Sequence, residues 1–425
     1  MRFRPRPVVL ATTASLALAA VAAGGAVAAV PAADTPAPST TAADAPPAPS
    51  TTAADAPPAP STTAADAASA PGGVRSPAAT DTDGDALPDL WETNGYDADG
   101  NGTIDVDLPA LGATPTKKDL FVEMDYMAGR LASTTALDRI VEVFATAPVS
   151  NPDGSTGIRL HLDAGAARGT AYDLGGGNEV PYDSNLQPAV QQTDAIKAVH
   201  FAPARQAVFH YMLWADDYDN TCSSGNAFAI PNDTFIVTMG PKCKWTVTEN
   251  MAVGTFIHEL GHNLGLTHGG TDHANYKPNY LSVMNYFFQF DGVPRTSGSA
   301  WFSYSSFAPP ALTETSLRES VGLNTSAAST WRTKWKCPDG TTRTSGAANL
   351  GIDWNCDGDT TDTAAADVND DNRSTTLAAQ NNWASIRFGG GDVGGGGEQH
   401  KVSTSADALR ELTRQEVAQL RAGTR

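Results

Sequence analysis

The sequence predicts an α+β fold, and three observations carry this prediction. Apolar residues gather in several segments of strand length between positions 119 and 238, and two longer segments repeat apolar residues at helical spacing. Beyond residue 269 the chain is rich in Gly, Asn, Ser and aromatic residues, and its apolar residues show little regular spacing. We therefore expect a sheet with helices, followed by an irregular lobe.

The predicted elements alternate in the order strand, helix, three strands, helix. Four segments have the pattern of strands: 119–125, 157–162, 207–214 and 234–238. A first helix is predicted over 136–147. A second follows 234–238, with its capping box formed by Thr246 and Glu249 and its buried stripe running from Val253 to Leu264. A last helix is predicted at 406–420, after a glycine-rich hinge or loop at 389–397.

The second helix contains the most informative stretch, HELGHNLGLTH, which starts at His258. Positions i and i+4 of a helix share one face, so His258 and His262 can bind one zinc ion while Glu259 is carried toward the attacking water. Gly265 then accepts the left-handed conformation that ends a helix, which lets the chain deliver His268 as a third ligand. Three protein ligands leave the fourth position open, as in a catalytic zinc site.

These positions match the HExxHxxGxxH signature, and the chain therefore resembles the metzincin zinc endopeptidases. The run SVMNY at 282–286 resembles the Met-turn of that clan. The resemblance covers residues 116–290 and implies a metzincin-like catalytic domain, in which a twisted mixed sheet lies above two helices and Met284 forms an apolar floor beneath the ligands. Tyr286 occupies the position where some members carry a tyrosine that can touch the metal or the reaction intermediate. His273 is the alternative third ligand, but its spacing from His262 is less suitable.

The first 28 residues predict a secretory signal peptide. Three arginines precede an apolar run at 8–23, and a small-residue cleavage site follows at 26–28. A membrane anchor is the alternative, but the run is short and alanine-rich, and no stop-transfer charges follow it. We therefore expect a secreted, extracellular protein with no membrane span.

Residues 29–80 predict a disordered linker. Pro, Ala, Ser and Thr dominate them, and DAPPAPSTTAA repeats with an 11-residue period. The linker has no cysteine, so a thiol switch that blocks zinc is not expected. A linker aspartate that blocks the metal is the alternative to a solvated tether; the candidates are Asp34, Asp44, Asp55 and Asp66.

The formal net charge of −19 argues against nucleic acid and anionic membranes as partners. Much of the acidity has the spacing of calcium loops, in which alternating carboxylates place oxygens on one side of a turning chain. The first loop, within residues 81–110, contains Asp81, Asp83, Asp85, Asp89 and Glu92. The second contains Asp97, Asp99, Asn101 and Asp105. A third cluster, in the lobe 291–425, contains Asp353, Asn355 and Asp357.

These loops depart from the EF-hand pattern. Ala86 stands where the first loop would carry its turn glycine, and Leu108 stands where the second would carry a bidentate glutamate. Residues 81–89 resemble instead the DxDGDxxPD pattern of thrombospondin type 3 repeats. We expect Ca²⁺ at these loops, with solvated acidic turns as the alternative.

Four cysteines in an exported chain predict two disulfides. Three pairings are possible. We favour the local pairs Cys222 with Cys243 and Cys337 with Cys356, because each closes a modest loop.

These features together predict a secreted, monomeric zinc endopeptidase that hydrolyses protein or peptide substrates. Glu259 would act as the general base and Tyr286 would assist the developing oxyanion. Two alternatives stay open. One is a calcium-dependent extracellular adhesion protein with a vestigial protease lobe, and the other is a zinc hydrolase of non-protein substrates.

Overall fold

The computed structural model describes residues 79–395 and 410–423, all of which lie within a compact unit that spans Gly73–Arg425. The predicted signal peptide, nearly all of the predicted linker and the start of the predicted C-terminal helix fall outside the described residues. Among those described, every helix is too short or too polar to span a bilayer.

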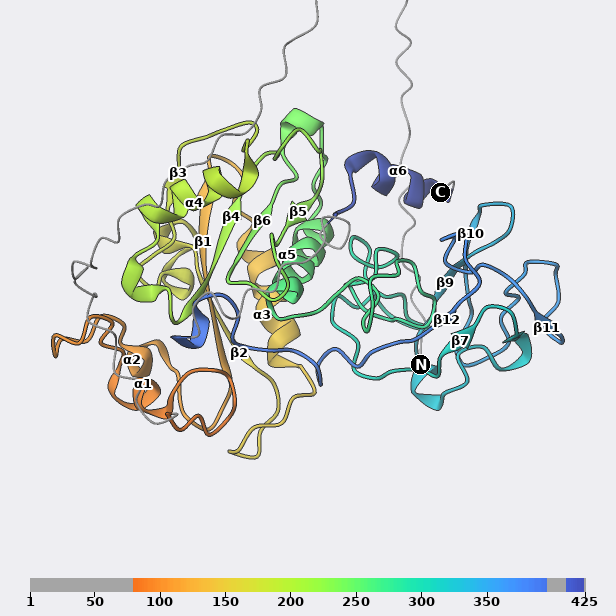
Figure 1. Ribbon diagram of the computed structural model, residues 1–425, viewed down its shortest axis with the longest axis horizontal. Helices are drawn as coiled ribbons and strands as arrows, with labels where there is room; N and C mark the ends of the chain where they lie inside the picture. The colour runs from red at the N-terminus through yellow and green to blue at the C-terminus, as the bar shows by residue number, and fades with distance from the viewer. Residues whose placement is uncertain (1–78, 396–409, 424–425) are drawn as a thin grey trace, which may run out of the picture. The chain divides into compact units, whose positions relative to one another are not determined.

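A six-stranded mixed sheet organises the first half of the described chain (Figure 1). Its order is β2-β1-β4-β6-β5, and β3 pairs with the end of β1. All neighbours are parallel except β5, which lies antiparallel to β6 at one edge. The strands are β1 (Asp119–Met127), β2 (Arg159–Asp163), β3 (Glu179–Val180), β4 (Phe209–Trp214), β5 (Gly225–Asn226) and β6 (Thr234–Val237). The predicted combination of helices with a mixed sheet is confirmed, and each of the four predicted strands is present within two residues of its expected bounds.

Helices cover both faces of this sheet, because alternate residues of each buried strand point to opposite sides. On one face, Val122 and Met212 pack with helices α3 (Thr134–Ala145) and α5 (Glu249–Asn263). On the other face, Phe121 and Tyr211 pack with α4 (Ala189–His200) and α2 (Leu108–Leu111). Helix α4 was not predicted from the sequence because its apolar face is weak: Ala189 and Thr193 are its buried residues. The short α1 (Asp89–Asn94) precedes α2.

Helix α5 begins later than predicted. Its N-cap is Thr248, whose side chain accepts a hydrogen bond from the backbone N–H of Met251, so the predicted capping box of Thr246 and Glu249 is wrong. The helix ends at Asn263, and Gly265 has a φ of 85°, the left-handed conformation expected of it. Nearly the whole helix is buried, since it lies between the sheet and the segment that follows it.

The region after residue 269 is irregular, as expected. Three two-stranded sheets pair β7 with β12, β8 with β11 and β9 with β10 around a separate apolar core. Their bounds are β7 (Leu312–Thr313), β8 (Leu317–Arg318), β9 (Lys334–Lys336), β10 (Thr342–Thr344), β11 (Thr363–Ala364) and β12 (Thr376–Leu377). The last helix, α6 (Arg414–Ala422), starts at a capping box of Thr413 and Glu416. The predicted helix over 406–420 therefore begins too early, because Thr413 has extended backbone.

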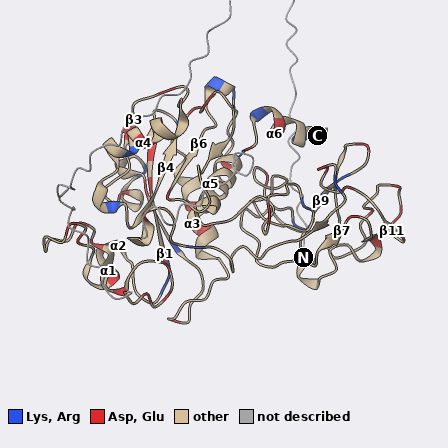
Figure 2. Cartoon of the chain, in the orientation of Figure 1, with Lys and Arg blue, Asp and Glu red and all other residues tan. Residues whose placement is uncertain are grey.

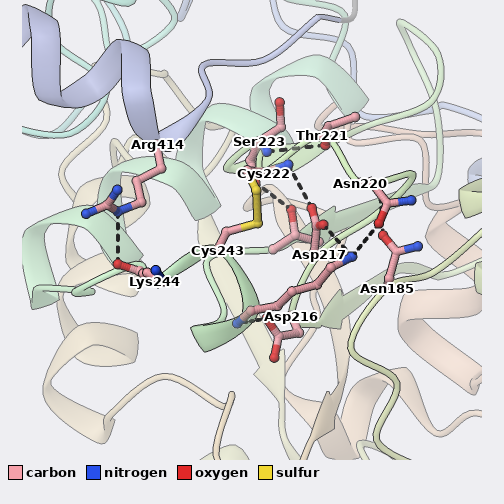
Figure 3. The surroundings of a disulfide bond; sticks show 12 residues. Asn185, Asp216, Asp217, Asn220, Thr221, Cys222, Ser223, Cys243, Lys244 and Arg414 are labelled. Atoms are coloured by element: carbon pink, nitrogen blue, oxygen red, sulfur yellow. Dashed lines mark hydrogen bonds and ion pairs between the residues drawn. A yellow bond between two sulfur atoms is a disulfide. The ribbon is translucent and has the colours of Figure 1, made fainter. Parts of the chain in front are cut away.

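Both favoured disulfides are present: Cys222 with Cys243 and Cys337 with Cys356. The first joins the segment before β5 to the loop before α5 (Figure 3). It therefore fixes the chain at the edge of the sheet, beside the helix that carries the histidines.

Candidate metal centre

Helix α5 and the turn after it bring three imidazoles together. His258 and His262 lie one turn apart on α5, and the turn at Gly265 returns His268 to the same point. The Nε2 atom of His262 is 3.2 Å from that of His258 and 3.0 Å from that of His268. All three side chains are buried. The structure thus collects the three histidines that the spacing singled out, whereas His273 is exposed.

Backbone carbonyls orient two of these rings from behind. The Nδ1 atom of His258 lies 2.8 Å from the carbonyl oxygen of Val283, and that of His262 lies 2.8 Å from the carbonyl oxygen of Leu266. A ring nitrogen that donates to a carbonyl leaves the other nitrogen as a lone pair. Two inward lone pairs about 3 Å apart repel each other unless a cation lies between them, so the arrangement suits a metal ion.

The spacing of the nitrogens fits a tetrahedral zinc ion. Zn–N bonds of about 2.0–2.1 Å place two tetrahedral ligands roughly 3.3 Å apart. The measured separations of 3.0 and 3.2 Å are close to that value. Burial also lowers the pKa of His268 to about 4 and lowers the pKa of His262, which keeps both rings neutral and available as ligands.

A fourth side chain, the carboxylate of Glu411, completes the cluster. Its Oε1 atom is 2.9 Å from Nε2 of His268 and 3.2 Å from Nε2 of His262, and its Oε2 atom is 3.2 Å from Nε2 of His258. Burial opposes ionisation of Glu411, but the facing histidines outweigh it and lower the pKa of Glu411 well below its usual range. Glu411 is therefore a fourth candidate ligand beside the three histidines, at the place where an open position was expected.

Glu259 is buried beside this cluster. Among the described residues, neither of its carboxylate oxygens has a hydrogen-bond partner. Burial, reinforced by the nearby charge of Glu411, raises the pKa of Glu259 well above its usual range. The carboxylate lies against β5, where a Cβ atom added to Gly225 would come within 2.5 Å of Oε1 of Glu259. The absence of a side chain at Gly225 therefore makes room for the carboxylate of Glu259.

Tyr286 and Met284 lie close to the imidazoles. The ring of Tyr286 has its centroid 4.4 Å from that of His268, and its hydroxyl donates a hydrogen bond to the backbone carbonyl of Arg410. Met284 is buried against α5, since a Cβ atom on Gly261 would come within 2.4 Å of its sulfur. The hydroxyl of Tyr286 thus contacts a backbone carbonyl one residue before Glu411.

Two further histidines lie on strands of the sheet. His210 is buried on β4 against Asn263. His161 on β2 pairs with Asp119 at 2.6 Å.

The first acidic loop holds a dense group of buried carboxylates. Asp83, Asp85 and Glu92 are buried, and so is Asp119 at the start of β1. Burial raises the pKa of Glu92 to about 9 and that of Asp85 to about 8. Asp81 groups with Asp83 and Asp85, with carboxylate oxygens within 4.8 Å of one another. Ala86 takes a φ of 72°, so it adopts the left-handed turn for which glycine was expected.

The other predicted calcium ligands are more exposed or engaged with the backbone. Asp89 accepts hydrogen bonds from the backbone and the hydroxyl of Thr82. In the second loop, three carboxylates gather, those of Asp97, Asp99 and Asp105, while Asn101 donates to Asp99. In the third cluster, Asp353, Asn355 and Asp357 are joined by hydrogen bonds within the loop. Figure 2 shows acidic positions in the N-terminal loops around α1 and in the loops near β11.

Two residues of these sites escaped the sequence analysis. Glu411 lies 143 positions after His268, inside the segment 406–420 that was predicted to be a helix. Asp119 opens an apolar strand and lies outside the spacing of the acidic loop. A charged residue at the start of an otherwise apolar strand is unusual, and this pattern in the sequence could have indicated a functional role for Asp119.

Comparisons of the chain with protein-family models, curated proteins and solved structures found no match.

Proposed function

We propose that the chain is a secreted zinc-dependent endopeptidase with a metzincin-like catalytic domain. The observation that carries this proposal is the pairing of three converging imidazoles with a buried, unpartnered carboxylate one position after the first of them. His258, His262 and His268 would hold the metal, and Glu259 would be its neighbouring base. The two disulfides support secretion, because disulfides persist in oxidising compartments.

Each side chain has a defined task in this proposal. Zinc, when bound by His258, His262 and His268, would supply a water of lowered pKa and would polarise the scissile carbonyl. Glu259 accepts the proton of the attacking water and returns it to the leaving amine. Tyr286, whose hydroxyl reaches a backbone carbonyl near the metal cluster, would donate to the carbonyl oxygen of a bound peptide.

The edge of the sheet beside β5 is where a peptide substrate would bind. Strand β5 and the residues before it lie next to Glu259, and an extended peptide can add to such an edge through backbone hydrogen bonds. This edge favours a protein or peptide substrate over other substrates of a zinc hydrolase.

A second candidate is a binding protein whose zinc is structural. Glu411 favours it, since four protein ligands make a closed site. Such a protein would use its acidic loops, and not its metal centre, to interact with partners.

The proposal is tested by incubating the zinc-loaded full chain with a proteome-derived peptide library and identifying new peptide termini by mass spectrometry. The chain with Glu411→Gln is assayed in parallel, because it lacks the fourth carboxylate. We expect new termini from at least one of the two proteins. If both bind one zinc ion and neither releases peptides, the protein is not an endopeptidase.

A further inference from the structure

The residues around Glu411 lie along the edge of the sheet as an added strand. Ser223 and Thr413 pair in antiparallel fashion, and the backbone N–H of Ser224 donates to the carbonyl of Leu412 at 3.0 Å. The N–H of Arg414 donates to the carbonyl of Cys222 at 3.0 Å. Residues 410–414 therefore occupy the edge next to β5, where a peptide substrate would bind.

Side chains on both sides hold this segment. The hydroxyl of Ser223 donates to the carbonyl of Glu411 at 2.9 Å, and Tyr286 donates to the carbonyl of Arg410. Leu412 is fully buried in the core that contains α5. The backbone of the segment is thus bound as that of a substrate would be, while Glu411 contributes its carboxylate to the metal cluster.

Helix α6 anchors the segment after it leaves the edge. Val417 is buried, and Arg421 pairs with Asp291 at 2.7 Å. The side chain of Arg414 donates to the carbonyl of Lys244, next to the disulfide of Cys222 and Cys243 (Figure 3). The ion pair of Arg421 and the hydrogen bond of Arg414 are exposed, so each contributes little to the free energy that holds the segment in place.

In this arrangement Glu259 is closed off from solvent. A general base must reach a water molecule, yet both oxygens of Glu259 are buried and, within the described chain, unpartnered. We propose that residues 410–414 are a tethered inhibitory segment, with Glu411 at the fourth metal position, and that the enzyme is active when this segment leaves the cleft. This proposal rests on the proposed endopeptidase function.

The first test compares the full chain with its Glu411→Gln variant. An amide is a poorer metal ligand than a carboxylate, so the segment should dissociate more readily and kcat/KM should rise at least tenfold while one zinc ion stays bound. Glu142→Gln, the same change at an exposed position of α3, is the control and should leave kcat/KM unchanged. Loss of zinc from Glu411→Gln would make Glu411 a structural ligand and overturn the proposal.

The second test locks the segment in place. Ser223 and Thr413 are direct cross-strand partners, so the double variant Ser223→Cys, Thr413→Cys can form a disulfide between them. The oxidised variant should be at least tenfold less active than the same protein after mild reduction, and the wild type treated with the same reductant is the control.

The outcomes of these two tests separate the proposals. Equal activity of the locked and the reduced variant would overturn the inhibitory segment but not the endopeptidase. Inactivity of every zinc-bound form, Glu411→Gln included, would overturn the endopeptidase itself.

An independent observation concerns the buried carboxylates of the first acidic loop. Asp85, Glu92 and Asp119 place carboxylate oxygens within 4.8 Å of one another. Glu92 is 2% exposed, and neither of its oxygens has a hydrogen-bond partner among the described residues. Asp83, which is also buried, groups with Asp85. Asp119 contacts Arg159 at 3.2 Å and His161 at 2.6 Å.

Glu92 thus buries both of its carboxylate oxygens, unpartnered among the described residues, beside Asp85 and Asp119. Burial of unpaired charge is costly, and a bound cation would offset that cost. We infer that Ca²⁺ binds between Glu92 and Asp119, with Asp83 and Asp85 as further ligands. Asp119 is the first residue of β1, so the ion would join the acidic loop directly to the sheet.

The test measures thermal unfolding of the full chain with 1 mM Ca²⁺ or with a calcium chelator that leaves zinc in place. We expect Ca²⁺ to raise the Tm by about 5 °C or more. Glu92→Gln and Asp119→Asn should each lose most of this gain, whereas Asp89→Asn, whose carboxylate binds Thr82, should retain it. A gain of the same size in Glu92→Gln, or no gain in the wild type, would overturn the inference.

Discussion

Glu411 places a carboxylate oxygen 2.9 Å from Nε2 of His268, although 143 positions separate the two residues. The contact joins the C-terminal segment to the helix that carries the other histidines. If Glu411 blocks the metal site, activity has to be measured in a chain in which this carboxylate is absent. The kinetic variants are therefore made in the Glu411→Gln background.

Glu259→Gln should abolish most hydrolysis. The amide keeps the shape of the carboxylate but cannot accept the proton of the attacking water, and general base catalysis typically contributes about 10²- to 10⁴-fold. We expect kcat to fall by about two orders of magnitude or more while zinc content is unchanged. Peptide cleavage near the parent rate in this variant, with zinc bound, would contradict the proposed mechanism.

His268→Ala and His273→Ala should differ in metal content. Removal of His268 leaves two histidine ligands in the Glu411→Gln background, too few to hold zinc against dilution. Elemental analysis should therefore find His268→Ala largely free of zinc and inactive. His273 is exposed, so His273→Ala should retain both zinc and activity. The reverse pattern would show that the third ligand is misassigned.

Tyr286→Phe should retain zinc but lose turnover. Its hydroxyl already donates to a backbone carbonyl, that of Arg410, so it is placed to donate to a substrate carbonyl after the segment leaves. Loss of one such donor should lower kcat by about tenfold or more, with less effect on KM. An unchanged kcat would assign Tyr286 to packing against His268 alone.

His210 should make the fold sensitive to acid. Burial lowers its pKa to about 4 from 6.5, so the unfolded chain takes up a proton below about pH 6.5 that the folded chain resists. The contribution of neutral His210 to the free energy of unfolding is therefore fully present above pH 6.5. It is lost as the pH falls toward 4, and the loss is at most about 3 kcal/mol.

Urea unfolding at several pH values between 4 and 7 measures this slope. His210→Gln does not titrate and should show a flatter dependence on pH than the wild type. His200→Gln, at a partly exposed position, is the control. If the free energy of unfolding depended on pH in the same way in the wild type and in His210→Gln, His210 would not be the cause of the acid sensitivity.

Local sequence determined much of this protein. The i, i+4 spacing places His258 and His262 on one helical face, Gly265 permits the return to His268, and apolar runs mark the four main strands, because each of these effects acts within a few residues. Short loops also favoured the two disulfides that are present.

Tertiary structure alone decided which carboxylate faces the three imidazoles. Glu411 reaches the imidazoles because residues 410–414 add to the edge beside β5, and such pairing between distant segments leaves no periodicity in either of them. Asp119 joins the acidic loop for the same reason, since the start of β1 meets Glu92 only when the sheet has formed. Spacing along the chain specifies neighbours on one element, whereas contacts between elements depend on how the whole core packs.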